Sequence, residues 1–372
     1  KLLESRPVTS VTQALQGTVP GLNISTNSLG GQLGQSMNVN IRGTGTIGTG
    51  SSASALVLID GIEGNMNNLN ADDIESISVL KDASAASIYG SRAAFGVILI
   101  TTKSGKSGSS IISYTNNFRN AAPMNMPHLL NSFDFAHYFN ESAINNGGQA
   151  IFDANTIERI SDFIAGNITT TTIPNEGNGN WQFHERANDN VNWYDVHYKS
   201  AWSAENNINF NGGSDKYQYY ASANYLDQNG NLRYGEDRFK RFQTMGKINA
   251  KINDFVDLKV TSRFVRTHLN NPYYSSLSGL LYHDIVRMWP MMPYKDPNGH
   301  YMRNGKLAQL TNGSRSITNN DNVFLQGQIV IHPAAGWNIY AEAGLRTING
   351  NNPSNVHSVY EYTVKGEPLL LQ

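Results

Sequence analysis

The chain has 372 residues, with 28 Lys and Arg against 29 Asp and Glu, and it contains no cysteine. The balanced charge argues against an electrostatic nucleic-acid interface, and the lack of cysteine excludes disulfide scaffolds, thiolate metal sites and Cys nucleophiles. Charged residues make up only 15% of the chain, which also holds 34 Gly and 18 Tyr. This composition is typical of β-structure with long polar loops rather than of a helical enzyme.

The first hundred or so residues read as a mixed α/β domain. Strands are expected at Met37–Arg42, Leu56–Asp60, Ile74–Leu80 and Gly96–Lys103. A short helix is predicted over Asp82–Tyr89, because Asp82 is a favourable N-cap and Gly90 can end the helix. The Gly- and Ser-rich stretch 105–110 then predicts a linker, after which the character of the sequence changes.

From Ile111 onward the sequence alternates with a period of two. In Lys216–Leu226, for example, one face carries Tyr and Ala while the other carries mainly Gln, Ser and Asn. The same pattern predicts seven strands, at Ile111–Phe118, Ala201–Gly213, Lys216–Leu226, Phe239–Asn253, Phe255–His268, Asn322–Pro333 and Gly336–Ile348, with Val356–Val364 as a candidate for an eighth. Alternation sustained over this length indicates an antiparallel sheet.

Two features favour a transmembrane barrel over a soluble sheet with one wet face. The apolar faces have small residues in the middle and aromatic residues toward the ends, as expected for a lipid-facing band with aromatic girdles. Short turns also alternate with long connections, the longest at about 119–200 and 269–319. An up-and-down barrel produces this alternation because its turns and loops lie on opposite sides of the membrane.

The sequence motifs indicate no catalytic residue, no cofactor and no metal site. Gly43–Gly48 has the G-x-G-x-x-G spacing, but a strand rather than a helix follows it, so it lacks the helix N-terminus that binds a pyrophosphate. Asp227–Arg238 begins like a calcium-binding loop, but Leu232 replaces the required Gly and Arg238 the final Glu. The nine His are scattered without zinc-ligand spacing.

The first domain nevertheless carries a specific resemblance. Ala14–Gly21, Asn40–Gly43 and Leu58–Gly61 resemble motifs of the plug domain of TonB-dependent outer-membrane receptors. The longer run Asp73–Lys103 resembles the SusC/RagA branch of that family. Further on, Asn192–Tyr194 and the hairpin that begins at Gly212 are similar to the start of the barrel in the same branch.

The resemblance implies a fold: an α+β plug domain followed by part of an antiparallel transmembrane β-barrel. We expect the plug at 1–107 and the N-terminal portion of the barrel at 108–372, with long extracellular loops at about 119–200 and 269–319. Whole receptors of this kind have about 22 strands around a plugged lumen. Because seven or eight strands of so wide a barrel would leave edges exposed in lipid, we expect this chain to be part of a longer protein.

The resemblance also implies a function: TonB-dependent import of a nutrient, in the first place an oligosaccharide, across the outer membrane of a Gram-negative, Bacteroidetes-like bacterium. The implied partners are a SusD-like surface lipoprotein, the TonB complex, the transported ligand and outer-membrane lipid, with no nucleic acid. A peptide is the alternative cargo. A binding or adhesion protein without transport and a secreted glycan-acting enzyme are the alternative functions; the sequence does not identify the substrate.

Structural or gating roles in the plug are implied for the motif residues Arg42, Gly43, Asp60, Gly61, Asp82, Tyr89, Gly90 and Arg92. Arg42 and Arg92 are candidates for ion pairs between the plug and carboxylates of the barrel wall, with pairing inside the plug as the equal alternative. Charged residues expected to line the lumen are Glu205, Lys247, Lys259, Arg263, Glu342 and Arg346.

Candidate ligand-contacting aromatic residues occur in the long loops among Asn and Gly. They are Trp181, Trp193, Tyr194, Tyr273, Tyr274 and Trp289. Aromatic rings can stack on the apolar faces of sugars while amides hydrogen-bond the hydroxyls. Packing of the loops against themselves is the alternative explanation for the same residues.

Overall fold

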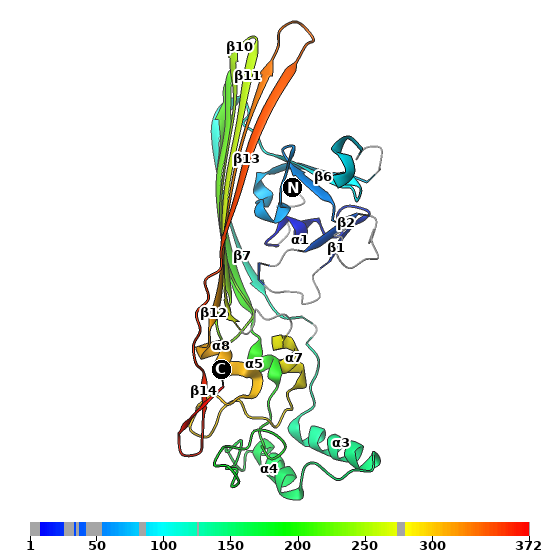
Figure 1. Ribbon diagram of the computed structural model, residues 1–372, viewed down its shortest axis with the longest axis vertical. Helices are drawn as coiled ribbons and strands as arrows, with labels where there is room; N and C mark the ends of the chain where they lie inside the picture. The colour runs from blue at the N-terminus through cyan, green and yellow to red at the C-terminus, as the bar shows by residue number, and fades with distance from the viewer. Residues whose placement is uncertain are drawn as a thin grey trace.

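The computed structural model describes residues 8–25, 33–34, 37–41, 54–81, 87–124, 126–273 and 280–371. Figure 1 shows three parts: a long curved sheet, a mixed domain against one face of it, and a unit of helices and loops at one end. No helix in these residue ranges is both long enough and apolar enough to cross a membrane.

The curved sheet has seven strands, which we call the wall. They are β7 (Gly108–Ala121), β8 (Ala201–Gly213), β9 (Tyr217–Asn229), β10 (Arg238–Asn253), β11 (Val256–Pro272), β12 (Arg315–Ile331) and β13 (Ile339–Asn351). Each strand pairs antiparallel with its neighbour in the chain. The seven predicted strands are confirmed, although several are longer than the alternation alone indicated.

The predicted eighth strand at Val356–Val364 is wrong as a part of the wall. Within it, β14 (Tyr360–Tyr362) pairs with β15 (Pro368–Leu370) in a separate two-stranded sheet. Val359 and Glu361 are buried there, and Glu361 forms an ion pair with Arg303 of a long loop. The alternation in this segment therefore comes from a small hairpin that packs on the loops.

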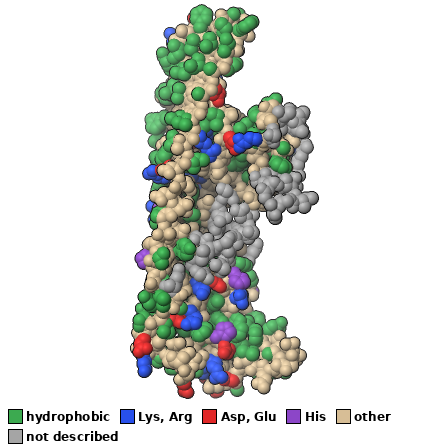
Figure 2. Space-filling model, viewed as in Figure 1, with side chains coloured by type: hydrophobic (Ala, Val, Ile, Leu, Met, Phe, Trp, Pro, Cys, Tyr) green, Lys and Arg blue, Asp and Glu red, His purple; other side chains and the backbone are tan. Residues whose placement is uncertain are grey.

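The two faces of the wall have opposite chemistry. On β8, Ser203, Glu205 and Asn207 point toward the mixed domain and are buried, whereas Trp202 points outward and is 63% exposed. Apolar side chains on the outer face gather over the far end of the sheet (Figure 2), where Ile252, Phe255, Trp337 and Ile339 are exposed. An apolar band on one face of such a sheet is what contact with lipid requires.

The mixed domain, which we call the plug, has a four-stranded sheet of order β4-β3-β6-β5. Its strands are β3 (Leu56–Ile59), β4 (Ile62–Glu63), β5 (Ile74–Leu80) and β6 (Val97–Thr102). A second sheet pairs β1 (Leu22–Ser25) with β2 (Asn38–Ile41), and the short helices are α1 (Val11–Leu15), η1 (Met66–Asn68) and η2 (Ala71–Asp73). The four predicted strands are confirmed; Ile59, Ile98 and Ile100 form the centre of the core.

The helix predicted over Asp82–Tyr89 falls mostly on residues 82–86, which lie outside the described residues. The chain that follows is η3 (Ser87–Ala93), a 3-10 segment interrupted at Gly90, whose φ is +72°. A left-handed conformation at this position favours glycine, so Gly90 does interrupt the helical path as the sequence indicated.

The third part, the loop unit, is built from the long connections at one end of the wall (Figure 1). Its helices are α3 (Ser132–Asn145), α4 (Ala154–Ile164), α5 (Trp193–His197), α7 (Leu280–Arg287), η4 (Asn304–Lys306) and α8 (Leu307–Asn312). One apolar cluster surrounds Trp193 and Leu307. A second surrounds Phe152 and Ile160, and Trp289 packs against both clusters.

Candidate functional site: the polar interface between plug and wall

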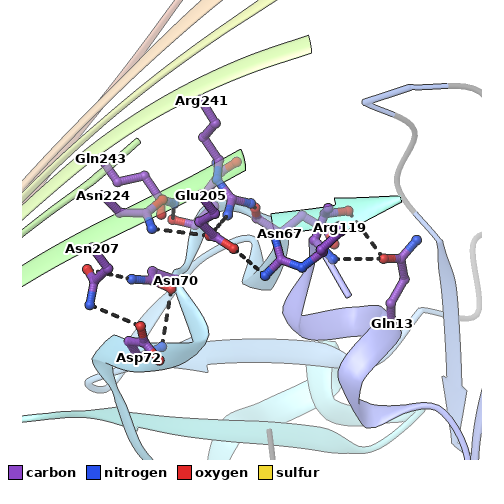
Figure 3. A network of polar contacts seen from close by, with 12 residues as sticks. Gln13, Asn67, Asn70, Asp72, Arg119, Glu205, Asn207, Asn224, Arg241 and Gln243 are labelled. Carbon is purple, nitrogen blue, oxygen red and sulfur yellow. Dashed lines mark hydrogen bonds and ion pairs between the residues drawn. The ribbon is translucent and has the colours of Figure 1, made fainter. Parts of the chain in front are cut away.

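The plug meets the inner face of the wall through polar groups, while each apolar cluster of the plug is made of plug residues. Period-two alternation explains this arrangement, because every second residue of β8, β9 and β10 faces the plug. Figure 3 shows the central part of the contact, with side chains from both sides pointing toward one another.

Asn207 of β8 makes the first contact. Its amide oxygen accepts a hydrogen bond from Asn70 at 2.9 Å, and its amide nitrogen donates to Asp72 at 3.0 Å. One wall side chain therefore binds both a donor, on the N-cap of η2, and an acceptor within η2. Next to it, the Tyr220 hydroxyl donates to Asp73 at 2.8 Å. Burial raises the pKa of the Asp73 carboxyl.

Glu205 of β8 is the centre of a second cluster (Figure 3). Its two oxygens accept from Arg119 at 2.6 Å and from Arg241 at 3.4 Å, and Asn224 donates to it at 3.1 Å. A single buried carboxylate thus lies between two guanidinium groups, and this fixes the direction of both arginines. The sequence predicted Glu205 as a lumen charge.

Two side chains of β10 at this cluster hydrogen-bond to the plug backbone. Arg241 donates to the carbonyl of Asn67 at 3.2 Å, and Gln243 donates to the carbonyl of Asn68 at 2.6 Å. The sequence analysis did not single out either residue as a plug contact. The alternation could have identified them, since both lie on the polar face of the strand predicted over Phe239–Asn253.

Asp60 makes the third contact, and its geometry explains the Leu58–Gly61 motif. Asp60 and Gly61 both have positive φ, +52° and +90°, as a type I′ turn requires, and Asp-Gly is a favoured pair there. The Asp60 carboxylate accepts from the backbone and hydroxyl of Thr102 at 2.9 and 2.6 Å, and from Lys247 of β10 at 3.1 Å. The turn therefore fixes the end of the plug sheet to the wall.

More wall residues reach the same end of the plug sheet. Lys247 also donates to the Thr102 carbonyl at 2.9 Å, and Gln326 of β12 donates to the Asp60 carbonyl at 3.1 Å. Arg346 of β13 makes a longer contact of 3.4 Å with the carbonyl of Glu63. Lys247 and Arg346 were among the charged residues predicted to line the lumen.

The remaining motif residues divide into three groups. Arg92 forms an ion pair of 2.6 Å with Glu63, so its partner is inside the plug and the bridge from Arg92 to a wall carboxylate is not formed. Tyr89 packs on the plug cluster around Val97. Arg42, Gly43, Asp82 and the loop residue Tyr274 lie outside the described residues.

Most of the candidate loop aromatics pack against other residues of the loop unit. Trp193 is fully buried, and its indole N–H donates to the carbonyl of Trp289 at 2.9 Å. Tyr194 is buried beside it. This is the self-packing that the sequence offered as the alternative for these three residues. Trp181 is half-buried and Tyr273 is 39% exposed, so both remain predicted ligand contacts.

His197 is a structural residue that the sequence analysis missed. It is buried, and its two ring nitrogens face the carbonyls of Trp193 at 2.8 Å and Gly305 at 2.6 Å. Burial lowers the pKa of this imidazole. His197 thereby joins α5 to η4, two segments from different long loops. In the described parts of the chain, no group of three or more His, Asp or Glu could hold a metal ion.

Comparison with known proteins places these features in a family. Residues 1–97 match the model of the TonB-dependent receptor plug domain. The chain is 30% identical over 303 residues to TonB-dependent receptor P26 of Formosa agariphila, covering 79% of this chain and 26% of that protein. It is 26% identical over 328 residues to TonB-dependent receptor SusC of Bacteroides thetaiotaomicron, covering 84% and 28%.

The fold is similar to that of a solved transporter. The structure of the RagAB peptide transporter matches with a TM-score of 0.75 and 25% identity, covering 95% of this chain and 40% of that chain. The same importer in its closed-closed state gives a TM-score of 0.74.

A plug held by polar contacts against the inner face of an antiparallel wall defines the class of TonB-dependent receptors. The chain belongs to the SusC/RagA type of that family and contains its plug domain and seven barrel strands. Its place is the outer membrane of a Gram-negative bacterium, and the family is non-enzymatic, as predicted. The chain spans about a quarter of the length of these two curated relatives, 26% and 28%.

Proposed function

We propose that the receptor containing this chain is a TonB-dependent importer of a nutrient. The observation that carries the proposal is the chemistry of the plug contact. Asn207, Gln243 and Lys247 bind the plug by one or two hydrogen bonds each, whereas the apolar clusters remain inside the plug. Such an interface can be opened without unfolding an apolar core.

The energetics fit a plug that moves under an external pull. A hydrogen bond within a protein contributes about 1 kcal/mol net, because water replaces it when it breaks. The wall residues that would be released are amides, hydroxyls and charged groups, all of which water solvates well.

The expected partners are a SusD-like surface lipoprotein at the loop unit and the TonB complex on the opposite side of the membrane. An oligosaccharide is the substrate that the resemblance implies first, and the loop aromatics would suit a sugar. Burial of Trp193 and Tyr194 removes part of that support. A peptide is the second candidate, favoured by the match to the RagAB peptide importer over 95% of this chain.

The test uses the whole receptor in cells with and without TonB, supplied with starch-derived oligosaccharides or with casein-derived peptides. We expect surface binding in both strains and uptake of one of the two pools only in the strain with TonB. Uptake that is equal in the two strains would contradict the proposal. Binding without uptake in either strain would instead support the adhesion alternative.

A further inference from the structure

The plug does not touch the wall everywhere. A half-open cavity of about 570 Å³ separates it from β7 and β8. This β7 cavity is lined by Glu75 and Lys106 on the plug side, Ser113 and Thr115 of β7, and Asn209 and Asn211 of β8. Its volume falls within the range of about 300–1,000 Å³ that is typical of sites for small molecules.

The contacts between plug and wall are distributed unevenly around this cavity. Hydrogen bonds to the plug come from β8, β9, β10, β12 and β13, whereas Ser113 and Thr115 of β7 face the cavity. At the margins of the cavity, Asn211 accepts from the Lys106 backbone at 3.0 Å and Tyr220 donates to Asp73. These two hydrogen bonds border the cavity, which keeps plug and wall apart over the rest of its lining.

A second gap between the plug and the wall can be compared with the β7 cavity. It measures about 220 Å³, lies over β10 to β13, and is lined by Asn249, Thr261 and Gln328. Lys247 and Gln326 also line it, and both bind Asp60 across the boundary between wall and plug. This second gap is smaller, and the side chains of two wall strands hold it through Asp60, whereas the β7 cavity is bridged at its margins by the bonds of Asn211 and Tyr220.

The lining of the β7 cavity suits a hydrophilic solute. Hydroxyl and amide groups predominate, and two acidic plug residues, Asp72 and Glu75, face the same space as two basic ones, Lys103 and Lys106. Groups of this kind can exchange hydrogen bonds with a passing polar molecule in place of water. Opposite charges at one site do not select a single sign of charge, so neutral and zwitterionic molecules both fit.

We propose that the transported solute passes the plug on the side of β7 and β8, through the β7 cavity, while the contacts of β10 and β12 keep the plug attached to the wall. This route rests on the proposed import function. It predicts that TonB action widens the β7 cavity and leaves the second gap unchanged.

The test introduces single cysteines into the whole receptor, and the chain offers a clean background because it has none of its own. N209C reports on the β7 cavity and N249C on the second gap. Both positions are half-buried on the inner face of the wall, so the same substitution is compared in matched settings. S113C and T261C form a second pair, which decides the question if one variant does not reach the cell surface.

The readout is the reaction rate with a small, membrane-impermeant cationic methanethiosulfonate, in cells with and without TonB that are supplied with the two nutrient pools. We expect TonB to raise the rate at N209C and S113C about tenfold, as when a minor open state of about a tenth becomes dominant. The rates at N249C and T261C should not change.

An equal or larger rise at N249C and T261C would overturn the proposed route, because the plug would then leave the whole wall. No rise at N209C and S113C would also overturn it, provided that the unmodified receptor still shows TonB-dependent uptake. If the unmodified receptor shows no such uptake, the import function itself fails. The two failures are therefore distinguishable.

Discussion

The loop unit and the plug interface both join segments that are far apart in the sequence, but they do so with opposite chemistry. In the loop unit, Trp193 and Leu307 come from different loops and are fully buried in one apolar cluster. In the plug interface, Asn207 binds Asn70 and Asp72, and Gln243 binds the carbonyl of Asn68. The first arrangement is a core, and the second is a set of separate contacts.

This difference determines how each region responds to force and to mutation. Removing a large side chain from an apolar core costs about 3–5 kcal/mol, because a cavity remains. Losing one hydrogen bond at a polar interface costs about 1 kcal/mol, since water can replace the partner. We therefore expect the loop unit to behave as one permanent body and the plug interface to open contact by contact.

The largest effect is expected for W193A in the loop unit. The substitution empties the centre of the cluster and removes the hydrogen bond to the Trp289 carbonyl, at a cost of about 4 kcal/mol. Protease digestion of the whole receptor at increasing temperature measures the loss as earlier cleavage of the loops. W202A is the matched control, because Trp202 is 63% exposed on the outer face. Equal sensitivity of the two variants would mean that the loop unit has no core of its own.

The largest effect at the plug interface is expected for E205Q. Glu205 is 7% exposed, and its charge balances Arg119 and Arg241. Removing the charged partner of such buried ion pairs lowers the free energy of unfolding by about 3 kcal/mol, because the guanidinium groups lose their counter-charge. The urea concentration at which the plug becomes accessible to protease should fall.

D321N provides the control for this prediction. Asp321 of β12 accepts hydrogen bonds from Arg266 of β11, an ion pair within the wall at strand positions that alternate with those facing the plug, so its loss should leave plug protection nearly unchanged. If E205Q has no greater effect than D321N, the cluster around Glu205 does not hold the plug.

The sequence was sufficient for features set by local rules. Period-two alternation predicted which residues of β8 face the plug, because it depends only on neighbouring residues. The partner of Arg92 could not be predicted, since Glu63 lies in β4, far from Arg92 in the sequence, and competes with every carboxylate of the wall. For the same reason, alternation at Val356–Val364 could not distinguish a wall strand from a hairpin on the loops.

The loop aromatics show the same limit. The residue types of Trp193 and Trp289 are suitable both for a ligand and for a core, and only the meeting of two long loops decides between them. Arg241 and Gln243 lie on a predicted polar face, but their plug acceptors are backbone carbonyls, which carry no signal in the sequence.

A pH-dependent effect of intermediate size is expected for D189N in the loop unit. Burial raises the pKa of Asp189 to about 6, above its ordinary value near 4. The folded loop unit therefore favours the protonated form, and stability falls as the pH rises from about 4 to 6 and the carboxyl ionises. D189N should stabilise the loop unit by about 2 kcal/mol above pH 6 and have little effect below pH 4.

Melting curves of the loop unit at pH 4 and pH 8 measure this prediction. D153N is a control with the opposite sign, because hydrogen bonds from Thr156 lower the pKa of Asp153 at the start of α4. Its charged form stabilises the fold above the ordinary pKa, so D153N should lose stability at pH 8 and little at pH 4. A gain of the same size for D189N at both pH values would contradict a role for ionisation.

The smallest effect is expected for Y220F at the plug interface. The substitution removes the hydrogen bond of 2.8 Å to Asp73 and leaves the ring in place, at a cost of about 1 kcal/mol in the urea assay of plug protection. Y225F is the control, because Tyr225 is exposed on the outward face of the same strand.

Combining variants tests the comparison between the two regions directly. Leu226 pairs with Glu205 across the sheet, so Tyr220 and Glu205 lie about 20 Å apart along the strands. The effects of Y220F and E205Q should therefore add within about 0.5 kcal/mol if the plug contacts are independent.

The effects of W193A and G305A on the loop unit should not add. A methyl group at Gly305 would lie 2.2 Å from the Trp193 ring, so removing the ring also removes the clash. Additive plug variants beside non-additive loop variants would establish separate contacts in one region and a cooperative core in the other; strong coupling between Y220F and E205Q would show that the plug is released as a single unit.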